Sequence, residues 1–211
     1  MIMVKICGIT RLEDALAAAD AGADAVGFNF WRPGKRYVSP ERAAEIAAEI
    51  AAALPAGIRR VGVFVDESAA SVREIAARVG LDTLQFHGSE TPDDLNAIEG
   101  YRKWKAFRMI PGWNPSVMGS YADVEAFLLD AAGSTPGGTG HTFDWSMAAA
   151  AKPWGNIVLA GGLTPGNVAE AIRAVHPWGV DVASGVEDSP GVKNHGLVRE
   201  FIRAARTEPG I

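Results

Sequence analysis

The sequence has a single cysteine, Cys7, and this scarcity limits what the protein can be. One thiol cannot close an internal disulfide, so nothing in the sequence points to an oxidising compartment. No apolar run approaches the roughly 20 residues that a membrane-spanning helix requires. No signal-type segment, with basic residues before an apolar stretch, opens the chain. We therefore expect a cytoplasmic protein that does not interact with a membrane.

Blocks of one charge and glycine motifs of the dinucleotide-binding type are also missing. The net charge is −5 with both signs mixed along the chain, so no basic block predicts a nucleic-acid partner. No G-x-G-x-x-G follows an early apolar run, which disfavours an open doubly wound sheet. An anionic small-molecule substrate stays open, because a local site can be positive on an acidic protein.

What the sequence does have is a regular alternation of short apolar runs with alanine-rich amphipathic segments. With 211 residues, 48% of them hydrophobic, the chain is large enough to bury one sizeable core. Eight strand–helix units of about 25 residues each predict an α/β fold, a closed (β/α)8 TIM barrel of parallel strands with its fifth helix short or degraded. We expect one catalytic domain over residues 1–206 and a frayed tail at 207–211.

The expected boundaries follow from the apolar runs and from the capping residues between them. The expected strands are 3–7, 24–28, 61–65, 83–86, 104–108, 126–129, 157–159 and 180–183. The expected helices are 11–21, 39–53, 68–79, 91–98, 116–124, 145–151, 164–174 and 197–206. Thr10 is the predicted N-cap of the first helix and Gly22 its stop.

In such a barrel the active site lies at the carboxyl ends of the strands, and the chemically distinctive residues fall there. Gly161 and Gly162 end the seventh strand, and Ser184 and Gly185 end the eighth. These loops predict a phosphate site, because backbone amides approach a ligand closely at glycine and a short helix beginning at Gly185 favours an anion. The plain alternative is that the glycines only relieve crowding in turns. The glycine-rich segment 137–140 is expected to close over or grip the substrate.

Cys7 ends the first strand and shares its inward face with Lys5. A cysteine often only packs, so the residues alone leave a reactive thiol and a structural one equally open. A thiolate base needs cationic or dipolar help, because the reference pKa of a thiol is about 8.5. Lys5 either gives that help or pairs with Asp181 on the neighbouring eighth strand. We favour the structural pair, because a buried cation needs a partner.

Three other polar residues each have a plain and a chemical interpretation. Asp130 follows an apolar run and either turns the chain or acts as a general acid with a raised pKa. Arg36 is either half of a solvated basic pair or a bidentate ligand for a substrate carboxylate. His87 shares an inward face with Gln85 and is expected to line the wall or to make hydrogen bonds, with catalysis a weaker alternative.

Taken in order, these segments resemble the phosphoribosylanthranilate isomerase family over essentially the whole chain. The segments that carry the resemblance are KICGIT at 5–10, GFNF at 27–30, RYVSP at 36–40, VGVF at 61–64, QFHG at 85–88, LLD at 128–130, GGTG at 137–140, FDW at 143–145, LAGGL at 159–163 and SGVE at 184–187. Two features depart from it. Phe86 stands where the family more often has leucine, and the bulky segment 31–34 leaves the path of its loop open.

The resemblance implies an Amadori rearrangement in tryptophan biosynthesis, with no cofactor and no metal. N-(5-phosphoribosyl)anthranilate becomes 1-(2-carboxyphenylamino)-1-deoxyribulose 5-phosphate. It implies Asp130 as the general acid on the furanose ring oxygen and Cys7 as the general base at C2′. It implies that Arg36 holds the anthranilate carboxylate, that His87 contributes to substrate binding and that the seventh and eighth loops hold the phosphate. The enzyme is expected to be a monomer or a homodimer.

Two other functions remain as alternatives. A histidine-pathway sugar isomerase on a related barrel resembles two half-barrels, with two phosphate sites and an aspartate at the end of the first strand. Here Cys7 ends that strand, and no glycine pair follows the third or fourth strand. A phosphate-binding barrel without turnover is the second alternative, and the presence of both Cys7 and Asp130 argues against it.

Overall fold

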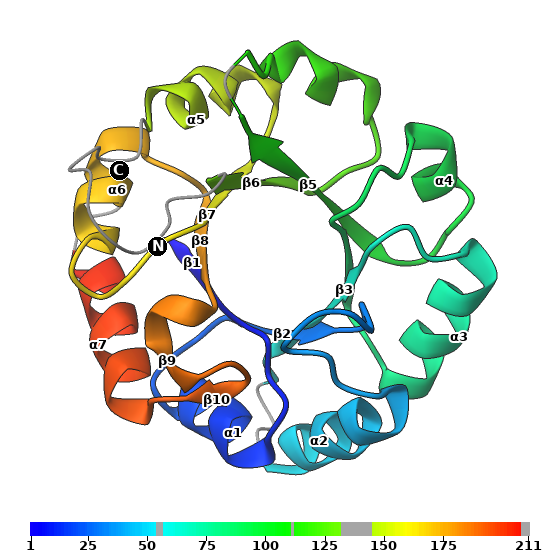
Figure 1. The fold of residues 1–211 in the computed structure, drawn as a ribbon, viewed down its shortest axis with the longest axis vertical. Helices are drawn as coiled ribbons and strands as arrows, with labels where there is room; N and C mark the ends of the chain where they lie inside the picture. Colours follow the sequence, from blue (N-terminus) through cyan, green and yellow to red (C-terminus); the bar gives the residue numbers. More distant parts are fainter. Residues whose placement is uncertain (54–56, 111, 132–144, 208–211) are drawn as a thin grey trace.

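Eight parallel strands close into a barrel in the order in which they occur in the sequence (Figure 1). The computed structural model describes residues 1–53, 57–110, 112–131 and 145–207. The strands are β1 (Met3–Cys7), β2 (Ala25–Asn29), β3 (Arg59–Phe64), β4 (Thr83–Phe86), β5 (Arg102–Met109), β6 (Ala126–Ala131), β7 (Ile157–Ala160) and β8 (Gly179–Val182). Pairing of β8 with β1 closes the ring, which confirms the predicted (β/α)8 barrel.

Helices surround the barrel and fill most of the connections between its strands (Figure 1). They are α1 (Leu12–Asp20), α2 (Pro40–Ala53), α3 (Ala69–Val79), α4 (Pro92–Asn96), α5 (Ser146–Ala151), α6 (Val168–Val175) and α7 (His195–Arg206). Three short 3-10 turns add to them, η1 (Pro115–Ser120), η2 (Lys152–Trp154) and η3 (Ser184–Val186). Among the described residues between β5 and β6, η1 is the only helical element, so the fifth helix is short, as predicted, although it ends at Ser120 and not at 124.

Local capping explains several helix boundaries. Ser68 caps α3 by accepting a hydrogen bond from the amide of Ser71, and Gly80 ends that helix in the left-handed conformation, with φ of 68°. Thr91 begins α4 with a capping box, in which its side chain and that of Asp94 each accept a backbone N–H of the other residue. These caps lie close in sequence to the groups they satisfy, so the sequence reveals them.

Two predicted helix starts are wrong. Arg11, not Thr10, precedes α1, and it makes no side-chain cap. The Thr10 hydroxyl instead donates to the carbonyl of Gly191, 2.6 Å away and 181 residues later. The helix expected to begin at 164 is α6, which begins at Val168, because Asn167 takes the N-cap position and its side chain accepts the amide of Thr164.

The core has two layers, one inside the barrel and one between the barrel and the helices. The inner cluster consists of Ala25, Val61, Trp104, Ala106, Ala126, Leu128, Val158 and Ala160. The outer cluster contains the alternate strand residues, such as Val4, Ile6 and Phe28, packed against the helices. Since Val4 and Ile6 face outward, Lys5 and Cys7 face inward, as the alternation predicts.

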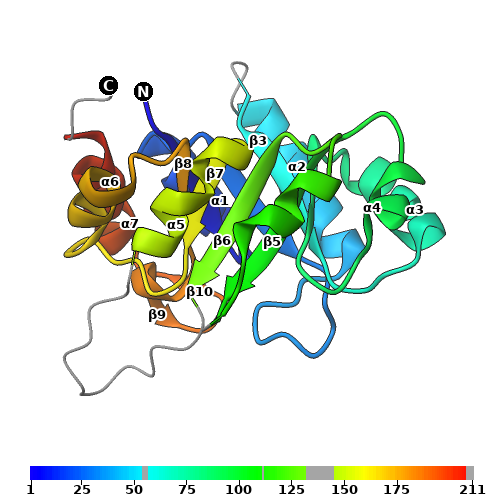
Figure 2. The same ribbon diagram turned by 90° about the horizontal axis from the view of Figure 1, so that it is seen from above.

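The two ends of the barrel differ. At the amino ends of the strands, the edge of Trp104 packs on Trp178, with ring centroids 5.9 Å apart, and its indole N–H donates to Glu125. At the carboxyl ends lie the loop after β2 and the hairpin of β9 (Glu187–Ser189) with β10 (Val192–Lys193) (Figure 2). In barrels of this kind the active site lies at the carboxyl ends of the strands.

Some predicted features lie outside the described residues. The glycine-rich segment 137–140 and most of the segment 143–145 belong to this group, and the predicted tail is described only as far as Thr207. No helix in the described part of the chain is long and apolar enough to cross a membrane.

Candidate active site

The predicted site residues all lie at the carboxyl ends of the strands. Cys7 is the last residue of β1, and Asp130 lies near the end of β6. The others lie in the loops that follow β2, β4, β7 and β8, and they are Arg36, His87, Gly161, Gly162, Ser184 and Gly185. The barrel therefore brings together residues that are far apart in the sequence.

Cys7 and Lys5 face the barrel interior side by side. The neighbouring Gly27 makes room for both, because a Cβ there would lie 2.8 Å from the Cys7 sulfur and 3.0 Å from the Lys5 ammonium. Lys5 is fully buried, and its Nζ lies 2.8 Å from a carboxylate oxygen of Asp181. The predicted Lys5–Asp181 pair is therefore present, and the same ammonium also lies beside the thiol.

The charges around Cys7 have opposing effects on its thiol. Burial raises the pKa of Cys7, the ammonium groups of Lys5 and Lys193 lower it, and the net pKa lies above the ordinary value. Burial alone would lower the pKa of Lys5, but Asp181 and Cys7 outweigh it and raise that pKa. Lys5 consequently stays a cation, and it favours the thiolate of Cys7 once that thiolate forms.

His87 and Asp130 face each other across the mouth of the barrel. The His87 Nε2 lies 3.5 Å from an Asp130 carboxylate oxygen, and both side chains are a little over one quarter exposed, at 29% and 27%. On the other side of the ring, the amide nitrogen of Gln85 lies 3.2 Å from His87 Nδ1. When the Gln85 amide donates to Nδ1, the neutral imidazole carries its proton on Nε2, which faces Asp130.

Arg36 is held by a partner that was not singled out for it from the sequence. Its Nε and Nη2 donate to the two carboxylate oxygens of Glu187, at 2.8 and 2.6 Å. The stem of Arg36 lies over Gly8, where a Cβ would overlap the arginine Cδ, so Arg36 passes directly beside the end of β1. Among the described residues, none accepts a hydrogen bond from the guanidinium Nη1.

Glu187 is bound by two cations. Besides Arg36, the buried Lys193 donates to it at 2.7 Å and also to the carbonyl of Ala183 at 3.2 Å. Burial alone would raise the pKa of Glu187, but the hydrogen bonds from Arg36 and Lys193 outweigh it and hold the pKa below its usual range. Burial lowers the pKa of Lys193, against the effect of Glu187. Neither Glu187 nor Lys193 was assigned a role from the sequence, because only the folded hairpin brings them to Arg36.

The loops after β7 and β8 touch through their backbones. Gly161 and Gly162 adopt positive φ values of 83° and 67°, a conformation that favours glycine. A Cβ on Gly185 would overlap the carbonyl oxygen of Leu163, so only glycine allows the loops to approach this closely. The short helix expected to begin at Gly185 is a single 3-10 turn, η3, which begins one residue earlier, at Ser184, and ends at Val186. The backbone is extended from Glu187 onward, where the hairpin begins.

The bulky loop after β2 forms one wall of a cleft of about 180 Å³ at the rim of the barrel. The residues that line the cleft are Phe30, Trp31, Arg32, Pro33, Phe64, Val65 and Glu67. Phe30 stacks on Phe64 with ring centroids 5.2 Å apart, and the Arg32 guanidinium lies over the ring of Tyr37. These contacts give the path of segment 31–34, which the sequence did not predict.

Comparison with known proteins assigns the chain to a family. Residues 4–204 match the family model described as N-(5'phosphoribosyl)anthranilate (PRA) isomerase. The chain is 51% identical over 207 residues to the N-(5'-phosphoribosyl)anthranilate isomerase of Pelobacter propionicus, covering 98% of this chain and 96% of that protein. It is 50% identical over 209 residues to the enzyme of the same name from Geobacter metallireducens, covering 98% and 100%.

Solved structures agree with the sequence relatives. Phosphoribosyl anthranilate isomerase from Thermotoga maritima has a TM-score of 0.87 and 42% identity, covering 99% of this chain and 100% of that one. A phosphoribosyl anthranilate isomerase in complex with reduced 1-(o-carboxyphenylamino)-1-deoxyribulose 5-phosphate has a TM-score of 0.85 and 41% identity, with the same coverage. The fold, the residues at the mouth of the barrel and these similarities together show that the chain belongs to the N-(5'-phosphoribosyl)anthranilate isomerase family.

Proposed function

We propose that Asp130 and Cys7 act as general acid and general base in the isomerisation of N-(5-phosphoribosyl)anthranilate to 1-(2-carboxyphenylamino)-1-deoxyribulose 5-phosphate. This Amadori rearrangement is a step of tryptophan biosynthesis, and it is the activity of the family to which the chain belongs. The observation that carries the assignment is the inward placement of a carboxyl group and a thiol at the same mouth, each beside a group that stabilises its anion. Those groups are His87 for Asp130 and Lys5 for Cys7.

The first step opens the sugar ring. Protonated Asp130 gives its proton to the furanose ring oxygen as the bond from that oxygen to C1′ breaks. The lone pair of the anthranilate nitrogen forms the double bond to C1′, which yields a Schiff base and a free hydroxyl group. The carboxylate that Asp130 becomes faces His87, whose Nε2 proton stabilises the negative charge.

The second step moves a proton from C2′. The Cys7 thiolate takes that proton, and the electron pair forms a C1′–C2′ double bond while the nitrogen regains its lone pair. The resulting enolamine becomes the ketone when C1′ gains a proton and the C2′ hydroxyl loses one. Because burial raises the pKa of Cys7, the thiolate depends on Lys5 for its stability.

The substrate carries a negative charge at each end, and groups at the mouth of the barrel can bind each of them. Arg36, oriented by Glu187, offers Nη1 to the anthranilate carboxylate. The touching loops at Gly161–Gly162 and Ser184–Gly185 offer a close approach to the ribose phosphate. A related isomerase binds a reduced product that has both a carboxyl group and a phosphate group, and this supports the same division here. We further propose that the enzyme is cytoplasmic and acts as a monomer or a homodimer.

Turnover of phosphoribosylanthranilate by the purified protein tests these roles, beside Cys7→Ser and Asp130→Asn. Each variant should lose at least ~10²-fold in kcat while its unfolding transition stays near that of the parent. A variant that keeps its rate shows that its residue has another role. An inert parent at micromolar enzyme would show that the proposed reaction is wrong for this chain.

A further inference from the structure

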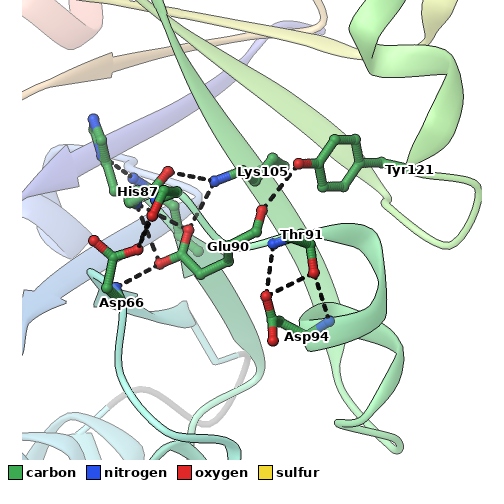
Figure 3. Close-up of polar contacts among 10 residues, drawn as sticks. Asp66, His87, Glu90, Thr91, Asp94, Lys105 and Tyr121 are labelled. Atoms are coloured by element: carbon green, nitrogen blue, oxygen red, sulfur yellow. Dashed lines mark hydrogen bonds and ion pairs between the residues drawn. The ribbon is translucent and has the colours of Figure 1, made fainter.

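The chain directly after His87 is tied to a buried ion pair behind it (Figure 3). Lys105 lies on the outward face of β5, and its ammonium is 2.7 Å from a carboxylate oxygen of Glu90, in the loop after β4. The two side chains are only 2% and 5% exposed. They lie outside the barrel wall and have no place in the proposed acid–base chemistry.

This pair holds Gly88 through both of its backbone polar groups. The Lys105 ammonium donates to the carbonyl of Gly88 at 2.7 Å, and the amide of Gly88 donates to Glu90 at 2.9 Å. That amide belongs to the peptide unit that joins His87 to Gly88. The orientation of the peptide after the His87 Cα is therefore set by the ion pair.

The rest of His87 is held from other directions. Its own amide donates to the carbonyl of Phe64 at 2.8 Å, so the peptide units on both sides of its Cα are hydrogen-bonded. Its ring then reaches Gln85 through Nδ1 and Asp130 through Nε2. The backbone on both sides therefore sets the direction of the His87 Cα–Cβ bond, and Gln85 contacts the ring itself.

The loop after β3 braces the same segment. The amide of Asp66 donates to Glu90 at 2.9 Å, and the Asp66 carboxylate accepts the amide and the hydroxyl of Ser89 at 2.7 and 2.8 Å. Asp66 adopts a positive φ of 51°, which is uncommon for a residue other than glycine. A Cβ on Gly88 would overlap the Asp66 carboxylate, so the two loops pack without space between them.

Stability alone is a poor explanation for this arrangement. Removing two charges from water costs about as much as their attraction returns, and apolar residues of similar volume often serve a fold equally well. A fully hydrogen-bonded buried pair does fix direction, and here every one of these bonds converges on the three residues after His87. We propose that Lys105 and Glu90 are positioning residues, which fix the His87–Gly88 peptide so that the imidazole faces Asp130. This inference rests on the proposed role of Asp130.

The test removes both charges at once, so that no single buried charge is left. In Lys105→Met/Glu90→Leu both hydrogen bonds to Gly88 are lost, and we expect kcat to fall by about 10- to 100-fold with KM changed far less. Glu90→Asp is the second variant, because it keeps both charges but draws the carboxylate back from Gly88. Glu90→Asp should also lower kcat, and it tests the inference even if the double variant folds poorly.

The decisive comparison repeats the double substitution in a His87→Asn background. If the pair acts through His87, the double substitution should lower kcat by no more than about twofold in that background. An equal loss in both backgrounds overturns the inference, and so does an unchanged kcat in the parent background. Thr91→Ala is the matched control, because it removes the capping box next to Glu90 without a contact to Gly88, and it should keep the parent kcat.

Asp130→Asn is measured in parallel to separate the two proposals. If it stays active, the acid assignment fails, and the positioning role that rests on it fails with it. If it is inactive while the Lys105 and Glu90 variants keep their kcat, only the positioning role fails.

Discussion

The carboxylate of Glu187 binds the guanidinium of Arg36 through three hydrogen bonds, two from Nε and one from Nη2, across 151 residues of sequence. Lys193 donates to the same carboxylate from the other strand of the hairpin. Glu187 therefore links the loop after β2 to the loop after β8 and orients Arg36 towards the mouth of the barrel. Its substitution should affect both stability and the binding of an anionic substrate.

In Glu187→Gln, the free energy of unfolding should change less with pH in the acid range than it does in the parent. Because Arg36 and Lys193 hold the folded pKa of Glu187 below its usual value of about 4.3, its contribution to stability is complete above that value. The contribution is lost as the pH falls through the folded pKa. Urea unfolding at pH 7 and pH 4 should show a larger loss of stability in the parent than in the variant.

Glu49→Gln is a suitable control for this experiment, since Glu49 is exposed on α2. It should lose as much stability as the parent between the two pH values. An identical pH dependence in the parent and in Glu187→Gln would contradict the linkage.

The reactivity of Cys7 should rise with pH. Burial raises the pKa of this thiol above its usual value of about 8.5, so the thiolate is scarce at pH 7. The rate of alkylation by iodoacetamide, followed by mass spectrometry, should still be rising at pH 8.5. Lys5→Met should slow the reaction at every pH below the plateau, because the cation that lowers the pKa is gone. A plateau below pH 8 would show that the thiol pKa is not raised.

Gly185→Ala should weaken phosphate binding. The new methyl group would overlap the carbonyl of Leu163 and force apart the two loops that we assign to the phosphate. We expect the inhibition constant of inorganic phosphate and the KM of the substrate to rise by about tenfold or more. Gly166→Ala is the control on the loop after β7, since its nearest neighbour would be at an ordinary 3.7 Å. Equal inhibition constants for phosphate in Gly185→Ala and Gly166→Ala would show that phosphate does not bind where the loops after β7 and β8 meet.

Lys5→Met should destabilise the barrel strongly, because it leaves the Asp181 carboxylate buried without its cation. Breaking a buried pair from one side costs about 3–5 kcal/mol of unfolding free energy. Lys5→Met/Asp181→Asn should recover most of that loss, which urea unfolding measures. Arg42→Ala removes an exposed ion pair with Glu45 and should change the stability little. A double variant no more stable than the single one would show that the charge of Asp181 is not the cause.

The features that the sequence predicted correctly depend on neighbours in the chain or on simple topology. The helices expected over 68–79 and 91–98 begin directly after Ser68 and Thr91, which cap them through contacts with residues close in sequence, so their starts are visible locally. The Lys5–Asp181 pair was predictable because a closed barrel places the eighth strand beside the first. Thr10 has the composition of a cap, but its hydroxyl is taken by Gly191 from the far end of the chain.

The sequence by itself determined the order of the strands and placed Cys7, Asp130 and the glycine loops at their carboxyl ends. Alternation and capping act over a few residues, and closure of the barrel then sets which strands are neighbours. Only the tertiary structure decided that Arg36 binds Glu187, that Gly185 lies against the Leu163 carbonyl within a 3-10 turn, and that Lys105 and Glu90 brace the segment after His87. These contacts join separate loops, and their geometry depends on the exact path of each loop over the closed ring, which no local pattern encodes.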